Sequence, residues 1–192
     1  GTDTGVGKTV LTALLARFLR GRGFCVAALK PVCSGGRGDA VALRKALGSG
    51  LTLDEINPWH FRAAIAPSLA AGLEKKSVKI ESVVAHIRAM RKKSDVTLVE
   101  GAGGLLSPLG ENFNSRDLIA ALRATPIVVA QNKLGAVNHV LLTLEALQKK
   151  IRAKARVVLM SPPNPDAATA SNAKLLGDFF PQLGIGGGFP QV

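Results

Sequence analysis

Short apolar runs recur along this chain of 192 residues and are separated by longer segments of mixed polarity. The runs cover residues 24–29, 96–99, 126–130 and 157–160. Brief, nearly continuous apolar runs of this kind are typical of strands that are buried on both faces of a parallel sheet. Each run is followed by a polar residue, namely Lys30, Glu100, Gln131 or Ser161, and a functional loop is expected there.

The segments between the runs show the periodicity of amphipathic helices. In Lys8–Arg20 the apolar positions follow the i, i+3, i+4, i+7 pattern, namely Leu11, Leu14, Leu15 and Phe18. Helical segments are also expected within Val78–Met90 and Leu118–Arg123. The alternation predicts an α/β fold with a single doubly wound, mainly parallel sheet.

The domain organisation is predicted to be simple. No internal repeat or linker rich in Pro, Gly and Ser divides the chain, so we expect a single domain over residues 1–192. The chain begins at Gly1, inside a glycine-rich turn, so we expect the strand that usually precedes such a turn to be missing. It ends soon after Gly187–Pro190, and we expect truncation at both ends.

Charge and composition narrow the function classes. Lys and Arg outnumber Asp and Glu by 25 to 13, which gives a net charge of +12 and favours anionic partners. The basic clusters, at residues 88–93 and 149–156, lack interleaved aromatic residues, so no specific nucleic-acid site is expected. No apolar stretch approaches the roughly 20 residues that span a bilayer, so no membrane partner is expected. Two cysteines, Cys25 and Cys33, form no disulfide framework, which favours a cytoplasmic protein.

The first nine residues, GTDTGVGKT, form a candidate phosphate loop. Backbone N–H groups at a tight turn and at the start of a helix converge on an anion. The Lys8 ammonium can reach the outer phosphates of a nucleotide, and the Thr9 hydroxyl can bind Mg²⁺. Thr2 stands where the usual motif has its first glycine. A glycine-rich turn that merely begins a helix is the alternative.

Two acidic residues are candidate metal ligands. Glu100 follows the apolar run 96–99 and precedes a flexible loop, Gly101–Gly104. Asp39 precedes a helical run over residues 40–47, where a helix N-cap is the simpler interpretation. Together with Thr9 they would supply the hard oxygen ligands that Mg²⁺ prefers.

These pieces, in this order, resemble the dethiobiotin synthetase family. The shared motifs are the phosphate loop, Lys30–Gly35, Gly38–Ala40, Asn57–Pro58, Ala66–Pro67, Glu100–Gly104, Lys133–Gly135 and Asn138–His139. The resemblance covers about residues 1–145 and implies an ATP-dependent ligase of biotin synthesis with a P-loop fold. It implies that diaminopelargonic acid (7,8-diaminononanoate) and CO₂ form a carbamate, which ATP phosphorylates before the ring closes to dethiobiotin. It also implies a homodimer.

The resemblance implies a role for particular residues. Lys30, Lys8 and Thr4 would surround the carbamate and the transferring phosphoryl group, and Thr9, Asp39 and Glu100 would hold Mg²⁺. Ser34 and Asn138 would contact the substrate, the latter in the partner subunit. The nucleotide would lie against the phosphate loop, the neighbouring acids and later loops, specifically Gly5, Val6, Gly7, Lys8, Thr9, Val10, Asp39, Glu100, Gly101, Ala102, Gly103, Ser161 and Pro190.

The sequence departs from the family at the expected adenine site. The family commonly has an asparagine after the late strand, whereas this chain has Ser161. Two alternatives to the ligase stay open. One is a nucleotide-switch ATPase of the partitioning or site-placing kind, although such proteins usually carry an additional lysine where this chain has Asp3. The other is an inactive fragment of the ligase.

Overall fold

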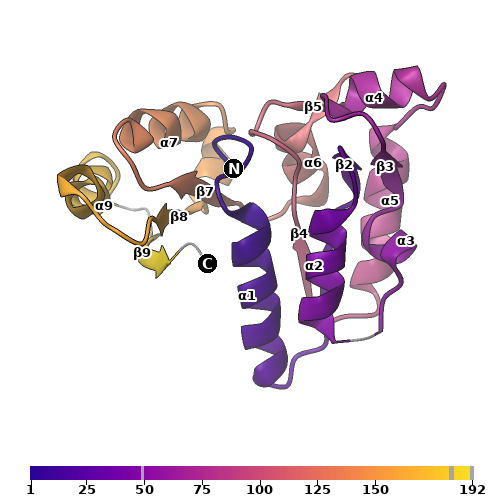
Figure 1. Ribbon diagram of the computed structural model, residues 1–192, viewed down its shortest axis with the longest axis horizontal. Coiled ribbons are helices and arrows are strands. Elements are labelled where there is room, and N and C mark those ends of the chain that lie inside the picture. The colour runs from indigo at the N-terminus through magenta and orange to yellow at the C-terminus, as the bar shows by residue number, and fades with distance from the viewer. Residues whose placement is uncertain (49, 182–183, 191–192) are drawn as a thin grey trace. The chain divides into compact units, whose positions relative to one another are not determined.

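The computed structural model describes residues 1–48, 50–181 and 184–190, the last segment by its backbone alone. These residues fall into two compact units, each with its own core (Figure 1). The first unit comprises residues 9–102 and 106–118, and the second comprises residues 1–8, 103–105 and the chain from 119 onward.

The first unit contains three strand pairs. β1 (Val26–Leu29) and β4 (Val96–Val99) pair in parallel, with Leu29 opposite Val99. β2 (Val32–Ser34) and β3 (Trp59–Phe61) form a second parallel pair, and β5 (Pro108–Gly110) and β6 (Phe113–Asn114) form an antiparallel one. Parallel strands end at the same edge of a sheet, so the residues that follow β1 and β4 are neighbours.

Helices of this unit follow from the local sequence. α1 (Lys8–Gly21) carries the predicted apolar stripe, and α2 (Gly38–Leu47) ends where Gly48 adopts a left-handed conformation at φ 77°. The short α3 (Leu53–Ile56) begins with a capping box between Thr52 and Glu55. The remaining helices are α4 (Pro67–Leu73) and α5 (Ile80–Arg91), while α6 (Ser115–Leu122) begins in this unit and its residues 119–122 belong to the second. Small and branched side chains form the core between α1, α2, α3 and β1, including Ala16, Ala28, Ala40, Leu43 and Ile56.

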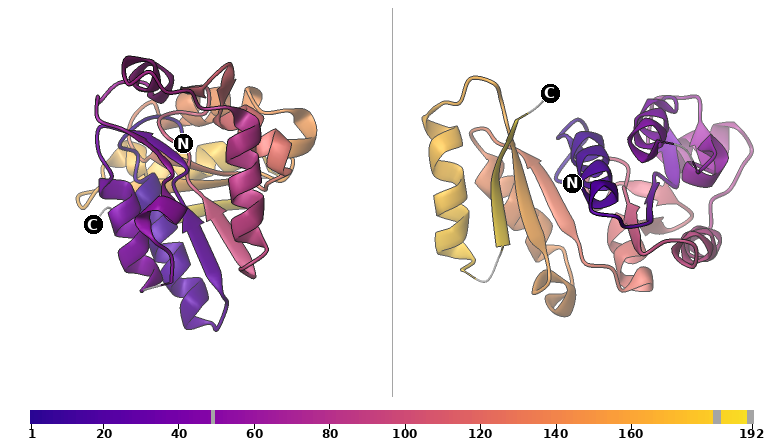
Figure 2. Two further views of the ribbon diagram at one scale, coloured as in Figure 1. Left: turned by 90° about the vertical axis from the view of Figure 1, so that its right-hand side faces the viewer. Right: turned by 90° about the horizontal axis from the view of Figure 1, so that it is seen from below.

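The second unit is built on a three-stranded parallel sheet in the order β7 (Ile127–Gln131), β8 (Arg156–Ser161) and β9 (Gly184–Pro190). α7 (Ala136–Glu145) packs on β7, and α9 (Ala167–Phe179) packs on β9 (Figure 2). The short α8 (Lys149–Arg152) precedes β8. Val140, Leu144 and Leu176 bury their side chains against Val157 and Leu159 of the sheet.

The predicted α/β architecture with parallel strands is confirmed. All four apolar runs contain strands, although the described strands hydrogen-bond in four groups rather than along one continuous sheet. Residues Gly187–Pro190 belong to β9, which pairs with β8. Among the described residues, no helix is long and apolar enough to cross a membrane.

Candidate active site

The candidate site in the first unit forms where β1 and β4 end side by side. Lys30 directly follows β1 and Glu100 directly follows β4, and the Glu100 backbone N–H donates to the Leu29 carbonyl at 2.8 Å. Thr9 lies in the first turn of α1, and Asp39 lies in the first turn of α2. Four residues that are up to 91 positions apart in sequence are thus brought into one cluster.

Short polar contacts connect the four side chains. Lys30 Nζ lies 2.7 Å from Glu100 Oε1 and 2.8 Å from Asp39 Oδ2. The Thr9 hydroxyl donates to the same Glu100 Oε1 at 2.7 Å. The predicted grouping of Thr9, Asp39 and Glu100 is therefore present, and Lys30 lies among them. The N-cap interpretation of Asp39 is wrong, because Arg37 occupies the N-cap and Asp39 is already inside the helix.

The ammonium of Lys30 is held in its charged state. Only 3% of Lys30 and 4% of Glu100 are exposed, whereas the Asp39 side chain is 47% exposed. Burial by itself lowers the pKa of Lys30, but Glu100 and Asp39 more than offset this effect, so that the pKa is raised above its ordinary value. The two ion pairs offset the cost of burying this charge.

Glu100 has one oxygen that the described residues leave unsatisfied. Its Oε2 is buried and accepts no hydrogen bond in the described part of the chain, although buried polar atoms are nearly always paired. A cation beside this oxygen would satisfy it. Within the described ranges, no group of three or more His, Cys, Asp or Glu side chains could hold a metal. Two carboxylates and a hydroxyl nevertheless fit Mg²⁺, which usually keeps several waters and takes further oxygens from phosphate.

The phosphate loop, residues 1–8, belongs to the second unit (Figure 1). Gly5 and Gly7 have φ of 71° and 93°, which favour glycine. A Cβ at Gly7 would lie 2.9 Å from Met160 Cγ, so this turn favours a residue that has no side chain. Lys8 Nζ donates to the Asp3 carbonyl at 2.6 Å and thereby bends back over the loop. Such a turn at the start of α1 fits the phosphates of a nucleotide.

The loop after Glu100 approaches its neighbours closely. A Cβ at Gly101 would lie 2.5 Å from Ser115 Oγ, and Gly103 has φ of 65°. The φ of Gly103 favours glycine, and a side chain at Gly101 would require the Ser115 hydroxyl to move.

Comparisons with known proteins identify the family of this chain. A family model described as "AAA domain" matches residues 1–182. ATP-dependent dethiobiotin synthetase BioD of Methanococcus vannielii is 38% identical over 150 residues, which cover 78% of this chain and 71% of that protein. BioD of Anaeromyxobacter dehalogenans is 42% identical over 178 residues, which cover 90% of this chain and 80% of that protein. The chain belongs to the dethiobiotin synthetase family.

A solved structure supports the P-loop fold. The GDP complex of the signal recognition particle 54 kDa protein from Aeropyrum pernix superposes with a TM-score of 0.52 at 15% identity. The match covers 96% of this chain and 39% of that protein. At this identity the likeness concerns the fold alone, and it confirms the P-loop α/β prediction.

Other residues that the dethiobiotin synthetase resemblance singled out are placed individually. Thr4 is exposed in the phosphate loop, and the half-buried Ser34 donates to the Ile65 carbonyl. Asn138 is exposed in the first turn of α7. Val10 lies in α1, and Pro190 ends β9 with its side chain outside the described part.

Ser161, the residue that replaces the family's asparagine, ends β8 and accepts a hydrogen bond from Asn132 Nδ2 at 3.0 Å. Asn132 is buried and also donates to the Thr169 carbonyl, while Asn172 donates to Asn132 Oδ1 at 2.8 Å. The sequence analysis missed this asparagine pair. Its only signal was that Asn132 lies two residues after the apolar run 126–130.

Proposed function

We propose that the chain is an ATP- and Mg²⁺-dependent dethiobiotin synthase, a ligase of biotin biosynthesis that converts 7,8-diaminononanoate and CO₂ to dethiobiotin. Its family membership supports the reaction class. The observation that carries the proposal is the buried Lys30 ammonium between Glu100 and Asp39, with the Thr9 hydroxyl on the same Glu100 oxygen.

Lys30 is proposed to bind the carbamate formed from CO₂ and one amine. Because its pKa is raised, the side chain stays cationic throughout the physiological pH range. It can therefore stabilise the carbamate anion and the charge that develops during phosphoryl transfer. Lys8 and Thr4 are proposed to complete this electrostatic environment at the phosphate loop.

The nucleotide is proposed to bind at the phosphate loop, with Thr9, Asp39 and Glu100 as the residues that hold Mg²⁺. When bound, the metal would neutralise charge on the phosphates. Gly5, Gly7 and the N–H groups at the start of α1 would position the triphosphate. Val6, Val10, Gly101–Gly103, Ser161 and Pro190 are proposed as the remaining nucleotide contacts.

The reaction balances without a protein nucleophile. A carbamate oxygen attacks the γ-phosphorus, and the bond from that phosphorus to ADP breaks. The second amine then attacks the carbamate carbon, phosphate leaves and the amine releases a proton as the ring closes. The task of the chain is to position and to neutralise charge, which can lower the barrier by several kcal/mol.

A homodimer is proposed to complete the substrate site. Ser34 would contact the substrate within one subunit, and Asn138 would reach the substrate of its partner. Exposed apolar side chains near Asn138, namely Leu134 at 84% and Leu142 at 61% exposure, support an interface on α7. A mixed sample of Lys30→Met and Asn138→Ala subunits should recover activity if the site is shared.

The test is an assay with 7,8-diaminononanoate, bicarbonate, Mg²⁺ and ATP, with mass detection of dethiobiotin. We expect product only when all four are present. Lys30→Met should lower the rate by at least about 100-fold, since the charge that stabilises the transition state is gone. Lys45→Met, which changes an exposed lysine on α2, is the matched control. If ATP is hydrolysed at the same rate with and without 7,8-diaminononanoate and no dethiobiotin forms, the switch ATPase is favoured instead.

A further inference from the structure

Asn57 lies behind the candidate site and carries no role in the proposed reaction. It is fully buried, directly follows α3 and uses both ends of its side-chain amide. Its Nδ2 donates to the Lys30 carbonyl at 2.6 Å, with longer contacts to the carbonyls of Pro31 and Trp59 at 3.5 and 3.4 Å. The amide therefore holds the turn from which the Lys30 side chain departs.

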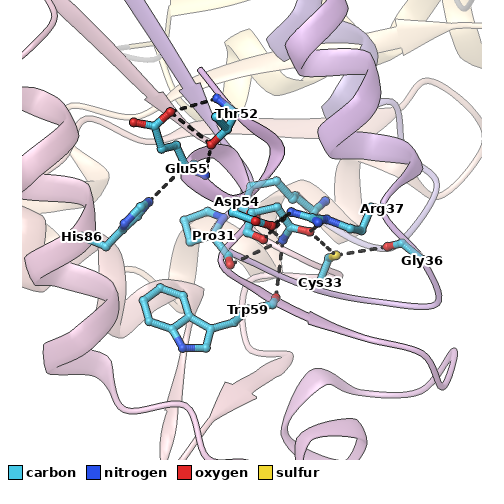
Figure 3. Close-up of polar contacts among 11 residues, drawn as sticks. Pro31, Cys33, Gly36, Arg37, Thr52, Asp54, Glu55, Trp59 and His86 are labelled. Carbon is cyan, nitrogen blue, oxygen red and sulfur yellow. Dashed lines mark hydrogen bonds and ion pairs between the residues drawn. The ribbon is translucent and has the colours of Figure 1, made fainter. Parts of the chain in front are cut away.

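The other end of the amide faces the segment that leads to Asp39. Asn57 Oδ1 accepts from Arg37 Nε at 3.3 Å and from Cys33 Sγ at 3.2 Å. Arg37 also donates to the Asn57 carbonyl at 3.0 Å and pairs with Asp54 at 2.8 Å. Figure 3 shows Arg37 and Asp54 together with Cys33 and Trp59. Because Arg37 is the N-cap of α2, these contacts fix the turn of helix that carries Asp39.

These contacts close a ring. It runs from the Lys30 backbone through the Asn57 amide to Arg37, along the first turn of α2 to Asp39, and back to Lys30 Nζ. We propose that Asn57 is a positioning residue that holds the Lys30 ammonium and the Asp39 carboxylate in contact by tying the turn after β1 to the start of α2. Its kinetic consequence rests on the proposed function.

Two variants distinguish the donor and acceptor roles of the Asn57 side-chain amide. Asn57→Ala removes both, whereas Asn57→Asp keeps an acceptor for Arg37 and loses the donor to the Lys30 carbonyl. Thr52→Ala is the control, because it breaks the capping box of α3 without touching the Lys30 turn. Where Asn57→Ala fails to fold, Asn57→Asp carries the test, since a carboxylate beside Arg37 is electrostatically tolerated.

The first readout is the ¹H–¹⁵Nζ spectrum of the lysine side chains, and it does not depend on catalysis. A buried ammonium with two carboxylate partners should exchange its protons slowly, and its signal is assigned by its loss in Lys30→Arg. We expect exchange at least about tenfold faster in the Asn57 variants and unchanged in Thr52→Ala. Unchanged exchange in Asn57→Asp would overturn the proposal, whether or not the wild type makes dethiobiotin.

The second readout is the dethiobiotin assay. We expect kcat to fall by about 10- to 100-fold in the Asn57 variants, because small displacements of a positioned group cost this much, with the KM for ATP within about twofold. Faster exchange with unchanged kcat would support the positioning by Asn57 and contradict the role proposed for Lys30. An equal loss of kcat in Thr52→Ala would show that the Asn57 variants act through a general loss of stability, and it would overturn the proposal.

Discussion

Removal of the charge of Glu100 should destabilise the protein strongly. In Glu100→Gln the side chain keeps its shape, and its amide oxygen can still accept from Thr9. Lys30 then stays buried with its charge, and its remaining anionic partner is the half-exposed Asp39. The new amide N–H₂ takes the place of the buried Oε2, which has no partner among the described residues, so its N–H groups would be unsatisfied there too.

The magnitude follows from these burials. Loss of one partner of a buried ion pair costs about 3–5 kcal/mol when the other charge stays buried. Because Asp39 still accompanies Lys30, we expect a value near the lower end, about 3 kcal/mol. In a chain of this size, each 1 kcal/mol shifts Tm by roughly 2–4 °C, so that Tm should fall by about 6–12 °C.

Urea and thermal unfolding followed by circular dichroism measure this effect. Glu81→Gln, at an exposed position of α5, is the control and should change the stability by less than about 0.5 kcal/mol. The double variant Lys30→Met with Glu100→Gln should be more stable than Glu100→Gln alone, because it removes the buried cation that has only the half-exposed Asp39 as a partner. The reasoning is refuted if the single variant is as stable as wild type, or if the double variant is less stable than the single one.

Three further predictions address other parts of the chain. Gly7→Ala should weaken ATP binding at least about tenfold in calorimetry, because φ of 93° disfavours a side chain and the new Cβ would meet the buried Met160; unchanged affinity would contradict the phosphate-loop assignment. The raised pKa of Lys30 should contribute stability below its unfolded pKa of about 10.4 that is lost as pH rises through the folded value, and Lys30→Met should remove this part of the alkaline pH dependence of unfolding. Iodoacetamide should modify the exposed Cys25 and spare Cys33, whose pKa is raised by burial, until the chain unfolds; equal rates under native conditions would contradict this.

The sequence predicted those parts of the fold that rest on local patterns. The four apolar runs are continuous enough, and the stripe on α1 is periodic enough, to be found without tertiary information. β2 and β3 are only three residues long, and their pairing depends on Val32 meeting Trp59 across 27 positions, so no local pattern marks them. The glycines at the end of β9 weaken the local strand signal, whereas the pairing with β8 holds this segment in a strand.

The residues of the candidate site could be predicted from the sequence, but the contacts among their side chains could not. The carboxyl ends of parallel strands meet at one edge, so Lys30 and Glu100 could be placed together from the order of the elements. The sequence could not show that Lys30 is buried between two carboxylates, because that depends on where α2 begins. The start of α2 is set by Arg37, which is held by a buried amide 20 positions further along the chain. The residues after the strands can therefore be predicted as site residues from the sequence. The alignment of their charges depends on Asn57, which no sequence periodicity marks.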